Sequence, residues 1–156
     1  MTVFIYRTPT VTSIGGRDGS VRSADGLIDL QLAFDRDGNR AGKTNPEELF
    51  AASYAASFHS SVKRVAADRK HIIGNSTVEA HVGVNPDLII NPQMFYGSSF
   101  MLTVDLHVTL PAVDAETAAS MVREAHRICP YSNATRNNVD VNLSVTTIDG
   151  NEHRVF

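Results

Sequence analysis

Cysteine is almost absent from this chain: Cys129 is the only one among 156 residues. A single thiol excludes a disulfide within the chain, which argues against a small secreted domain held by disulfides. No apolar run approaches the roughly 18 residues that a membrane-spanning helix needs. The N-terminus lacks a basic start followed by a long apolar run, so we expect no signal peptide. The sequence therefore predicts a cytoplasmic protein that does not enter a membrane.

An excess of charge of one sign is also missing. The formal net charge is -3 and the basic residues are dispersed, so nothing favours a nucleic acid as partner. Hydrophobic residues make up 42% of the chain and charged residues 20%, which is ordinary for a globular protein with a normal core. The length predicts a single domain over residues 1–156, or one protomer of a small oligomer.

Metal-binding spacings are missing too. The chain has six histidines, but none of them forms an H-x-x-x-H or H-E-x-x-H pattern, and C-x-x-C needs a second cysteine. His126 and Cys129 lie three residues apart on one helical face, where the imidazole could influence the thiol. We therefore predict no metal site and no cofactor.

The pattern of the first third indicates strands followed by a long helix. Thr2–Thr12 is rich in β-branched and aromatic residues, and apolar residues alternate over 28–34. The cluster Gly15–Gly19 predicts a turn. Asn45 suits the N-cap of a helix, with proline at the first helical position and glutamate at the capping-box position. This helix is expected to run to about Arg69.

The rest of the chain alternates between strands and one more helix. Period-two patterns predict strands over 78–84, 100–110 and 139–145, with a loop over 85–99. A second helix is expected to begin after Asp114 as N-cap and to end at Pro130. Because the strands group together and the helices are separate, the sequence predicts an α+β fold.

Four residues could carry chemistry, and each also has a purely structural interpretation. Cys129, at a helix C-terminus, suits a resolving thiol better than an attacking one, or is simply a buried cysteine. Ser57, inside the long helix, is otherwise a small packing residue. Glu47 is otherwise a charge favoured at a helix start, and Arg17 a solvated turn residue.

Three motifs resemble those of the Ohr/OsmC family, the organic hydroperoxide resistance proteins. Residues 45–58 (NPEELFAASYAASF) resemble the first signature, in which the position of Ser57 holds the peroxide-attacking cysteine. Residues 129–136 (CPYSNATR) resemble the second signature, with the resolving cysteine. Residues 15–19 (GGRDG), followed by 23–26 (SADG), resemble the N-terminal arginine loop. The likeness covers essentially the whole chain, and the Ohr branch fits better than the OsmC branch.

The resemblance implies a fold and an activity. The expected fold is an intertwined homodimer with long central helices flanked by antiparallel-rich sheets. The expected activity is a thiol-dependent peroxidase that reduces organic hydroperoxides to alcohols in oxidative stress defence. The reductant would be a dithiol or a lipoylated protein, and three aromatic residues near the site would line a pocket: Phe50, Tyr54 and Phe58.

The resemblance also assigns a role to each site residue. Arg17 would hold the attacking thiolate and polarise the peroxide, and Glu47 would orient Arg17 through a charge-assisted pair. Position 57 would attack the O–O bond, and Cys129 would close a disulfide with it. Glu47 and Ser57 are about 15 Å apart along one helix and roughly 80° apart around it. We therefore expect the second protomer to contribute to a shared site.

Ser57 is the departure from the family pattern. Serine has the shape of cysteine, but it has no accessible anion near neutral pH and no stable oxidised state. We therefore predict that the chain as written is inactive or nearly so, whether the serine replaces an original cysteine or is a natural divergence. Two other interpretations stay open: a non-catalytic binding module for apolar hydroperoxides or other apolar ligands, and a stress-associated dimer with a structural role.

Overall fold

The computed structural model describes residues 6–33, 41–86 and 100–156 and shows a mixed chain of helices and antiparallel-rich sheets. The α+β prediction is confirmed. The chain forms two units, Met1–Leu49 and Phe50–Phe156. The prediction of a single domain over 1–156 stays a prediction. No helix within the described ranges is long and apolar enough to cross a membrane.

The N-terminal unit contains a small antiparallel sheet. Its strands are β1 (Val11–Ile14), β2 (Ser20–Ser23) and β3 (Asp29–Gln31), paired in that order. The short 3₁₀ helix η1 (Gly16–Asp18) forms the turn between β1 and β2. A Cβ atom at Gly19 would lie 1.8 Å from a backbone oxygen, so this turn requires glycine there.

The sequence placed these strands only in part. The first strand begins at Val11, while residues 2–5 of the predicted segment lie outside the described residues. The alternation over 28–34 yields the three-residue β3, and Phe34 lies outside the described residues. β2 was not predicted, because a four-residue strand carrying a single apolar residue has no readable period.

Helix α1 (Pro46–Asp68) confirms the predicted long helix to within one residue of its end. The backbone N–H of Glu48 donates to the Asn45 side chain at 2.7 Å, which is the expected cap. The Thr44 hydroxyl donates to the Glu48 carboxylate at 2.7 Å and ties the incoming chain to the first turn.

The second unit is built on a four-stranded sheet. Its strands are paired in the order β4 (Thr77–Pro86), β5 (Phe100–Thr109), β6 (Asp140–Thr146) and β7 (Glu152–Arg154). β5 and β6 are parallel, and helices α2 (Ala115–Ile128) and α3 (Pro130–Thr135) lie between them in the chain. The predicted strands and α2 are confirmed. The polar β7 and the six-residue α3 were missed, and most of the predicted loop over 85–99 lies outside the described residues.

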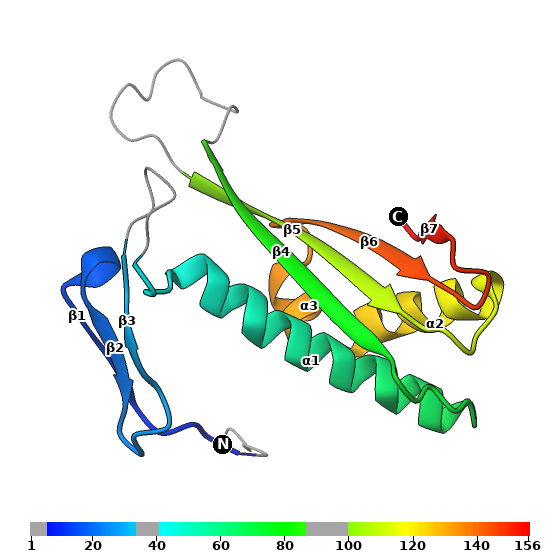
Figure 1. Cartoon of the computed structure of the whole chain (residues 1–156), viewed down its shortest axis with the longest axis horizontal. Coiled ribbons are helices and arrows are strands. Elements are labelled where there is room, and N and C mark those ends of the chain that lie inside the picture. Colours follow the sequence, from blue (N-terminus) through cyan, green and yellow to red (C-terminus); the bar gives the residue numbers. More distant parts are fainter. Residues whose placement is uncertain (1–5, 34–40, 87–99) are drawn as a thin grey trace. The chain divides into compact units, whose positions relative to one another are not determined.

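The helices cover one face of this sheet (Figure 1), and the alternating apolar positions of the strands point toward them. Asp114 caps α2 by accepting from the Thr117 N–H at 3.0 Å. The core formed in this way contains fully buried side chains from α1, β5, α2 and β6, such as Phe58, Leu106, Met121 and Leu143. Cys129 belongs to the same cluster, so the candidate thiol is anchored in this core.

Candidate active site

Cys129 lies at the junction of two helices. It ends α2, where its N–H donates to Ala125 at 2.9 Å, and it is also the residue that precedes α3. The expectation that Pro130 stops the helix is half right: α2 ends there, but Pro130 begins α3, since proline suits the first position of a helix. The Cys129 side chain is fully buried.

Ser57 lies opposite this thiol. The Ser57 Oγ is 3.6 Å from the Cys129 Sγ, within hydrogen-bonding range for sulfur. The two residues are 72 positions apart in the chain. Packing of α1 against the junction of α2 and α3 therefore brings together the two positions that the resemblance paired.

A buried hydroxyl network lies one turn before Ser57. The Tyr54 Oη is 2.9 Å from the Ser132 Oγ and 3.3 Å from the Thr135 Oγ1. The Thr135 hydroxyl donates to the Tyr131 carbonyl at 3.0 Å. Burial raises the pKa of Tyr54, against the opposing effect of these two hydroxyls, so the phenol keeps its proton at neutral pH.

The predicted pocket residues form one aromatic cluster. The ring centroids of Phe50 and Tyr54 are 5.9 Å apart, and those of Tyr54 and Phe58 are 6.4 Å apart, both edge-on. Tyr131 joins the cluster at 5.5 Å from Tyr54 and 6.0 Å from Phe50. Phe50 is half-buried, while Tyr54 and Phe58 are fully buried. That these rings line a substrate pocket stays a prediction.

Arg17 and Glu47 form a two-pronged ion pair within the N-terminal unit. Arg17 Nη1 donates to Glu47 Oε2 at 2.8 Å, and Nη2 donates to Oε1 at 2.5 Å. The Arg17 hydrogen bond lowers the pKa of Glu47, while partial burial opposes it. The Glu47 hydrogen bond raises the pKa of Arg17. Both groups are therefore charged at neutral pH. The expected pairing is present, and its catalytic role stays a prediction.

Comparisons with known proteins fit this arrangement. The family model described as OsmC-like protein matches residues 37–144. The organic hydroperoxide resistance protein of Xanthomonas axonopodis pv. citri is 38% identical over 144 residues, covering 90% of this chain and 95% of that protein. The chain belongs to the OsmC family. Relatives of this kind place it in the organic hydroperoxide resistance (Ohr) branch, as the motifs indicated.

Solved structures agree with membership of the Ohr branch. The crystal structure of OhrB from Bacillus subtilis matches with a TM-score of 0.77 at 37% identity, covering 89% of this chain and 98% of that one. A Vibrio cholerae chain, described as an organic hydroperoxide resistance protein with captopril bound in one of the active sites, matches with a TM-score of 0.81 at 36% identity. The match covers 97% of this chain and 96% of the Vibrio cholerae chain.

His126, three residues before Cys129, lies in apolar surroundings. Its ring packs against Phe58 and Phe156, with centroids 6.4 and 5.1 Å away. Its Nδ1 is buried without a hydrogen-bond partner among the described residues, and burial lowers its pKa, so the ring is neutral at physiological pH. The described residues contain no group of three or more potential ligands that could hold a metal.

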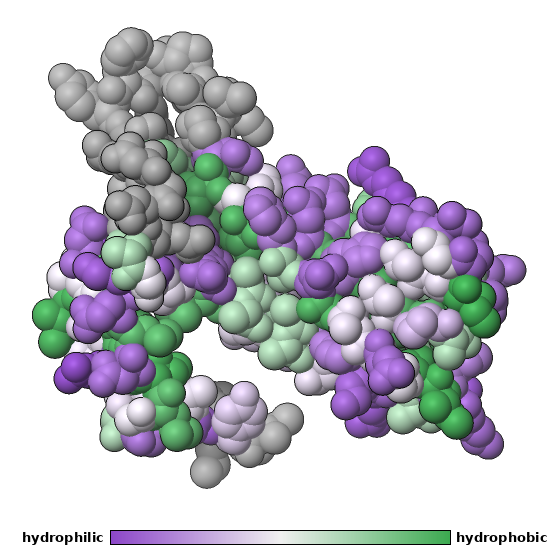
Figure 2. All heavy atoms as spheres, in the orientation of Figure 1, coloured by the Kyte–Doolittle hydropathy of each residue, from purple (hydrophilic) through white to green (hydrophobic). Residues whose placement is uncertain are grey.

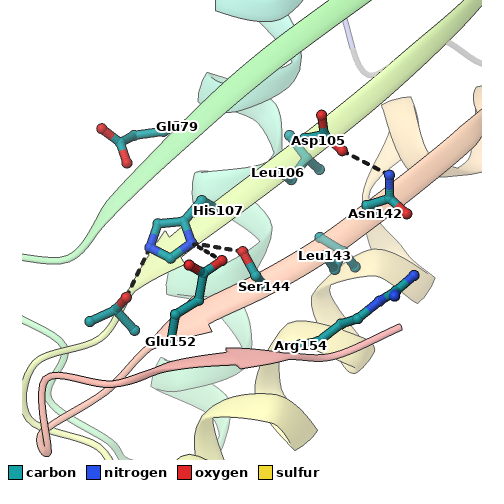
Figure 3. A pocket seen from close by; sticks show the side chains of 10 residues that line it. Glu79, Asp105, Leu106, His107, Asn142, Leu143, Ser144, Glu152 and Arg154 are labelled. Carbon is teal, nitrogen blue, oxygen red and sulfur yellow. Dashed lines mark hydrogen bonds and ion pairs between the residues drawn. The ribbon is translucent and has the colours of Figure 1, made fainter.

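A polar hollow on the outer face of the sheet was not foreseen from the sequence. It has a volume of about 720 Å³ and lies on the face away from the helices (Figure 3). His107, at its centre, is bonded to the Ser144 hydroxyl at 2.7 Å and to the Thr146 hydroxyl at 3.1 Å. The hollow is formed by side chains of neighbouring strands that point away from the helices. The alternation in the sequence could have indicated that this face of the sheet is polar, but not that it is hollow.

Proposed function

We propose that this chain is the scaffold of a thiol-dependent peroxidase that reduces organic hydroperoxides to alcohols in oxidative stress defence. We further propose that it is inactive or nearly so as written. The observation that carries the proposal is the 3.6 Å approach of the Ser57 Oγ to the Cys129 Sγ. A disulfide needs the two side chains to face each other at short range, and these two positions already do.

The chemistry requires sulfur at position 57. A thiolate there attacks one oxygen of the hydroperoxide, the O–O bond breaks, the sulfur loses two electrons, and the alcohol leaves with a proton. The resulting sulfenic acid reacts with the Cys129 thiol, which forms the disulfide and releases water. A dithiol or a lipoylated protein then returns two electrons and two protons. A serine hydroxyl is neither an accessible anion nor oxidisable in this way.

The ion pair supports the same proposal. Arg17 presents a planar charged fork that suits a thiolate and a polarised peroxide oxygen. Glu47 fixes that fork through two hydrogen bonds. The cytoplasm is the proposed location, because dithiol reductants are kept reduced there.

The proposed assembly is a homodimer. In the N-terminal unit, Leu32 is the one buried hydrophobic residue among those described, while Val11, Ile14, Leu27 and Leu30 are exposed. Figure 2 shows such apolar side chains at the surface of this unit. A three-stranded sheet with so little core needs a covering surface, and a second copy of the chain would supply it.

Sedimentation equilibrium tests this assembly. We expect a mass of twice the 17.0 kDa of one chain, held on dilution to low micromolar concentration. A fully folded monomer in dilute solution would contradict the homodimer, and with it the expectation that the second protomer contributes to a shared site.

The central experiment restores the sulfur. Consumption of tert-butyl or cumene hydroperoxide is followed with a dithiol reductant for the chain as written and for Ser57→Cys. We expect the cysteine form to be faster by about 10³-fold or more, since loss of a nucleophile has effects of that size or larger. The double variant Ser57→Cys with Cys129→Ser keeps the attacking thiol but cannot close the disulfide, so it separates these two steps.

The alternative is a non-catalytic binding module for apolar hydroperoxides or other apolar ligands. The observation that favours it is that the aromatic cluster around half-buried Phe50 is retained beside a residue without sulfur. Calorimetric titration with captopril and with cumyl alcohol addresses it. No turnover by the Ser57→Cys form, together with binding by the chain as written, would sink the peroxidase proposal and favour the binding module.

A further inference from the structure

We infer that Tyr54 is a positioning residue, whose buried hydroxyl holds the Cys129 junction against position 57. This inference rests on the proposed function, since it concerns the residue that aligns the two sulfur positions. Tyr54 was expected only as a pocket aromatic. The structure instead buries its ring completely and joins its hydroxyl to Ser132 and Thr135.

The connectivity of the network carries the argument. Tyr54 lies three residues before Ser57 on α1, and Ser132 lies three residues after Cys129 on α3. The bond between their hydroxyls, 2.9 Å long, therefore joins the two elements that carry the reacting positions. Because it lies one turn from each position, it limits sliding of α3 along α1.

The backbone and guanidinium contacts around Cys129 do not make this connection. The Cys129 N–H donates to Ala125, and the Asn133 N–H donates to the Cys129 carbonyl, both at 2.9 Å. Arg136 donates to the carbonyl of His126 at 3.1 Å. These bonds all lie within the segment that runs from α2 to α3. They shape the junction, whereas the Tyr54 hydroxyl, the Ser57–Cys129 contact and apolar packing join it to α1.

The hydrogen-bond roles are consistent with a fixed network. The Thr135 proton is directed at a backbone carbonyl, so the Thr135 Oγ1 is free to accept from Tyr54. The Tyr54 and Ser132 hydroxyls share one hydrogen bond, in which either can donate. Ser132 is fully buried, so removal of the phenol oxygen takes a hydrogen-bond partner from a buried hydroxyl. The edge-on contacts of the ring do not depend on that oxygen.

A thiol–disulfide equilibrium tests the inference without relying on peroxidase activity. The Ser57→Cys chain is equilibrated with reduced and oxidised glutathione, and the fraction with a disulfide between position 57 and Cys129 is read by intact mass. We expect Tyr54→Phe in this background to lower the effective concentration of the two thiols about fivefold, the size of one net hydrogen bond. Ser132→Ala, which removes the same bond from the other side, is expected to have the same effect.

The matched control is Ser61→Ala. Ser61 is a buried serine of α1 one turn after Ser57, and its hydroxyl donates to the Ser57 carbonyl at 3.1 Å within the same helix. We expect this change to leave the effective concentration unaltered. An unaltered value in Tyr54→Phe and Ser132→Ala, or an equal fall in Ser61→Ala, would overturn the inference. If the Ser57→Cys chain fails to consume hydroperoxide, the proposed function fails, while this equilibrium still decides the role of Tyr54.

Discussion

The Arg17–Glu47 pair and the Ser57–Cys129 pair are held in place by different forces. The first is an ion pair in a unit with little core, and 47% of the Arg17 side chain is exposed. The second lies at a helix junction, with Cys129 fully buried in the main core. An exposed ion pair contributes little stability, whereas a buried junction is fixed by packing and a hydroxyl network. The stability of the fold therefore depends little on the Arg17–Glu47 pair and more on the packing around Cys129.

The largest effect that would sharpen this contrast is on catalysis. In the Ser57→Cys background, Arg17→Lys keeps the charge but loses the two-pronged fork. We expect kcat/KM for cumene hydroperoxide to fall about 10²-fold, comparable with loss of a preorganised donor. The free energy of unfolding should change by less than about 0.5 kcal/mol, because the pair is exposed.

Arg22→Lys is the matched control for this prediction. Arg22 lies in β2 of the same unit and donates to Asp29 at 2.8 Å in an exposed ion pair. We expect neither activity nor stability to change. Equal losses of activity in the two variants would show that Arg17 has no special role and would remove the contrast.

The smallest effect concerns pH. The folded-state pKa of Glu47 lies below its ordinary value of 4.5, chiefly because of the Arg17 hydrogen bond. The stabilisation from this pair is therefore fully present above that ordinary value and is lost as the pH falls through the lowered folded-state value. Side-chain carboxyl titration by NMR should detect the pKa of Glu47 below 4.5, and should find it raised in Arg17→Ala, where the Arg17 hydrogen bond is lost.

A second measurement checks the sign of this linkage. The pH dependence of unfolding in Glu47→Gln should lack the Glu47 contribution on the acid side. If Arg17→Ala does not change the pKa of Glu47, the Arg17–Glu47 ion pair does not persist in solution. The comparison between this ion pair and the Ser57–Cys129 pair would then fail.

The sequence predicted the second unit better than the first. The long alternation of β5 and the Asp114 cap are local signals of the second unit, and both are confirmed. β2 and β7 are too short and too polar to show a period. The parallel pairing of β5 with β6 depends on the path of α2, which no local pattern records.

The candidate site was predictable only as separate motifs. Arg17 and Glu47 are 30 positions apart, and Ser57 and Cys129 are 72 apart, so their approach depends on tertiary packing. The role of the Tyr54 hydroxyl was not foreseen. Its partners become visible only when α3 packs against α1, although proline directly after Cys129 could have indicated that a new helix begins there.

Single-turnover oxidation of the Ser57→Cys chain tests the central claim most directly. One equivalent of cumene hydroperoxide is added without reductant, and intact mass and cumyl alcohol are measured together. The account predicts one alcohol per chain and the loss of two hydrogen atoms as the disulfide to Cys129 closes, with neither change in the chain that carries Ser57. Alcohol formation at an equal rate by the chain with Ser57, or an untouched hydroperoxide with the Ser57→Cys chain, would contradict it.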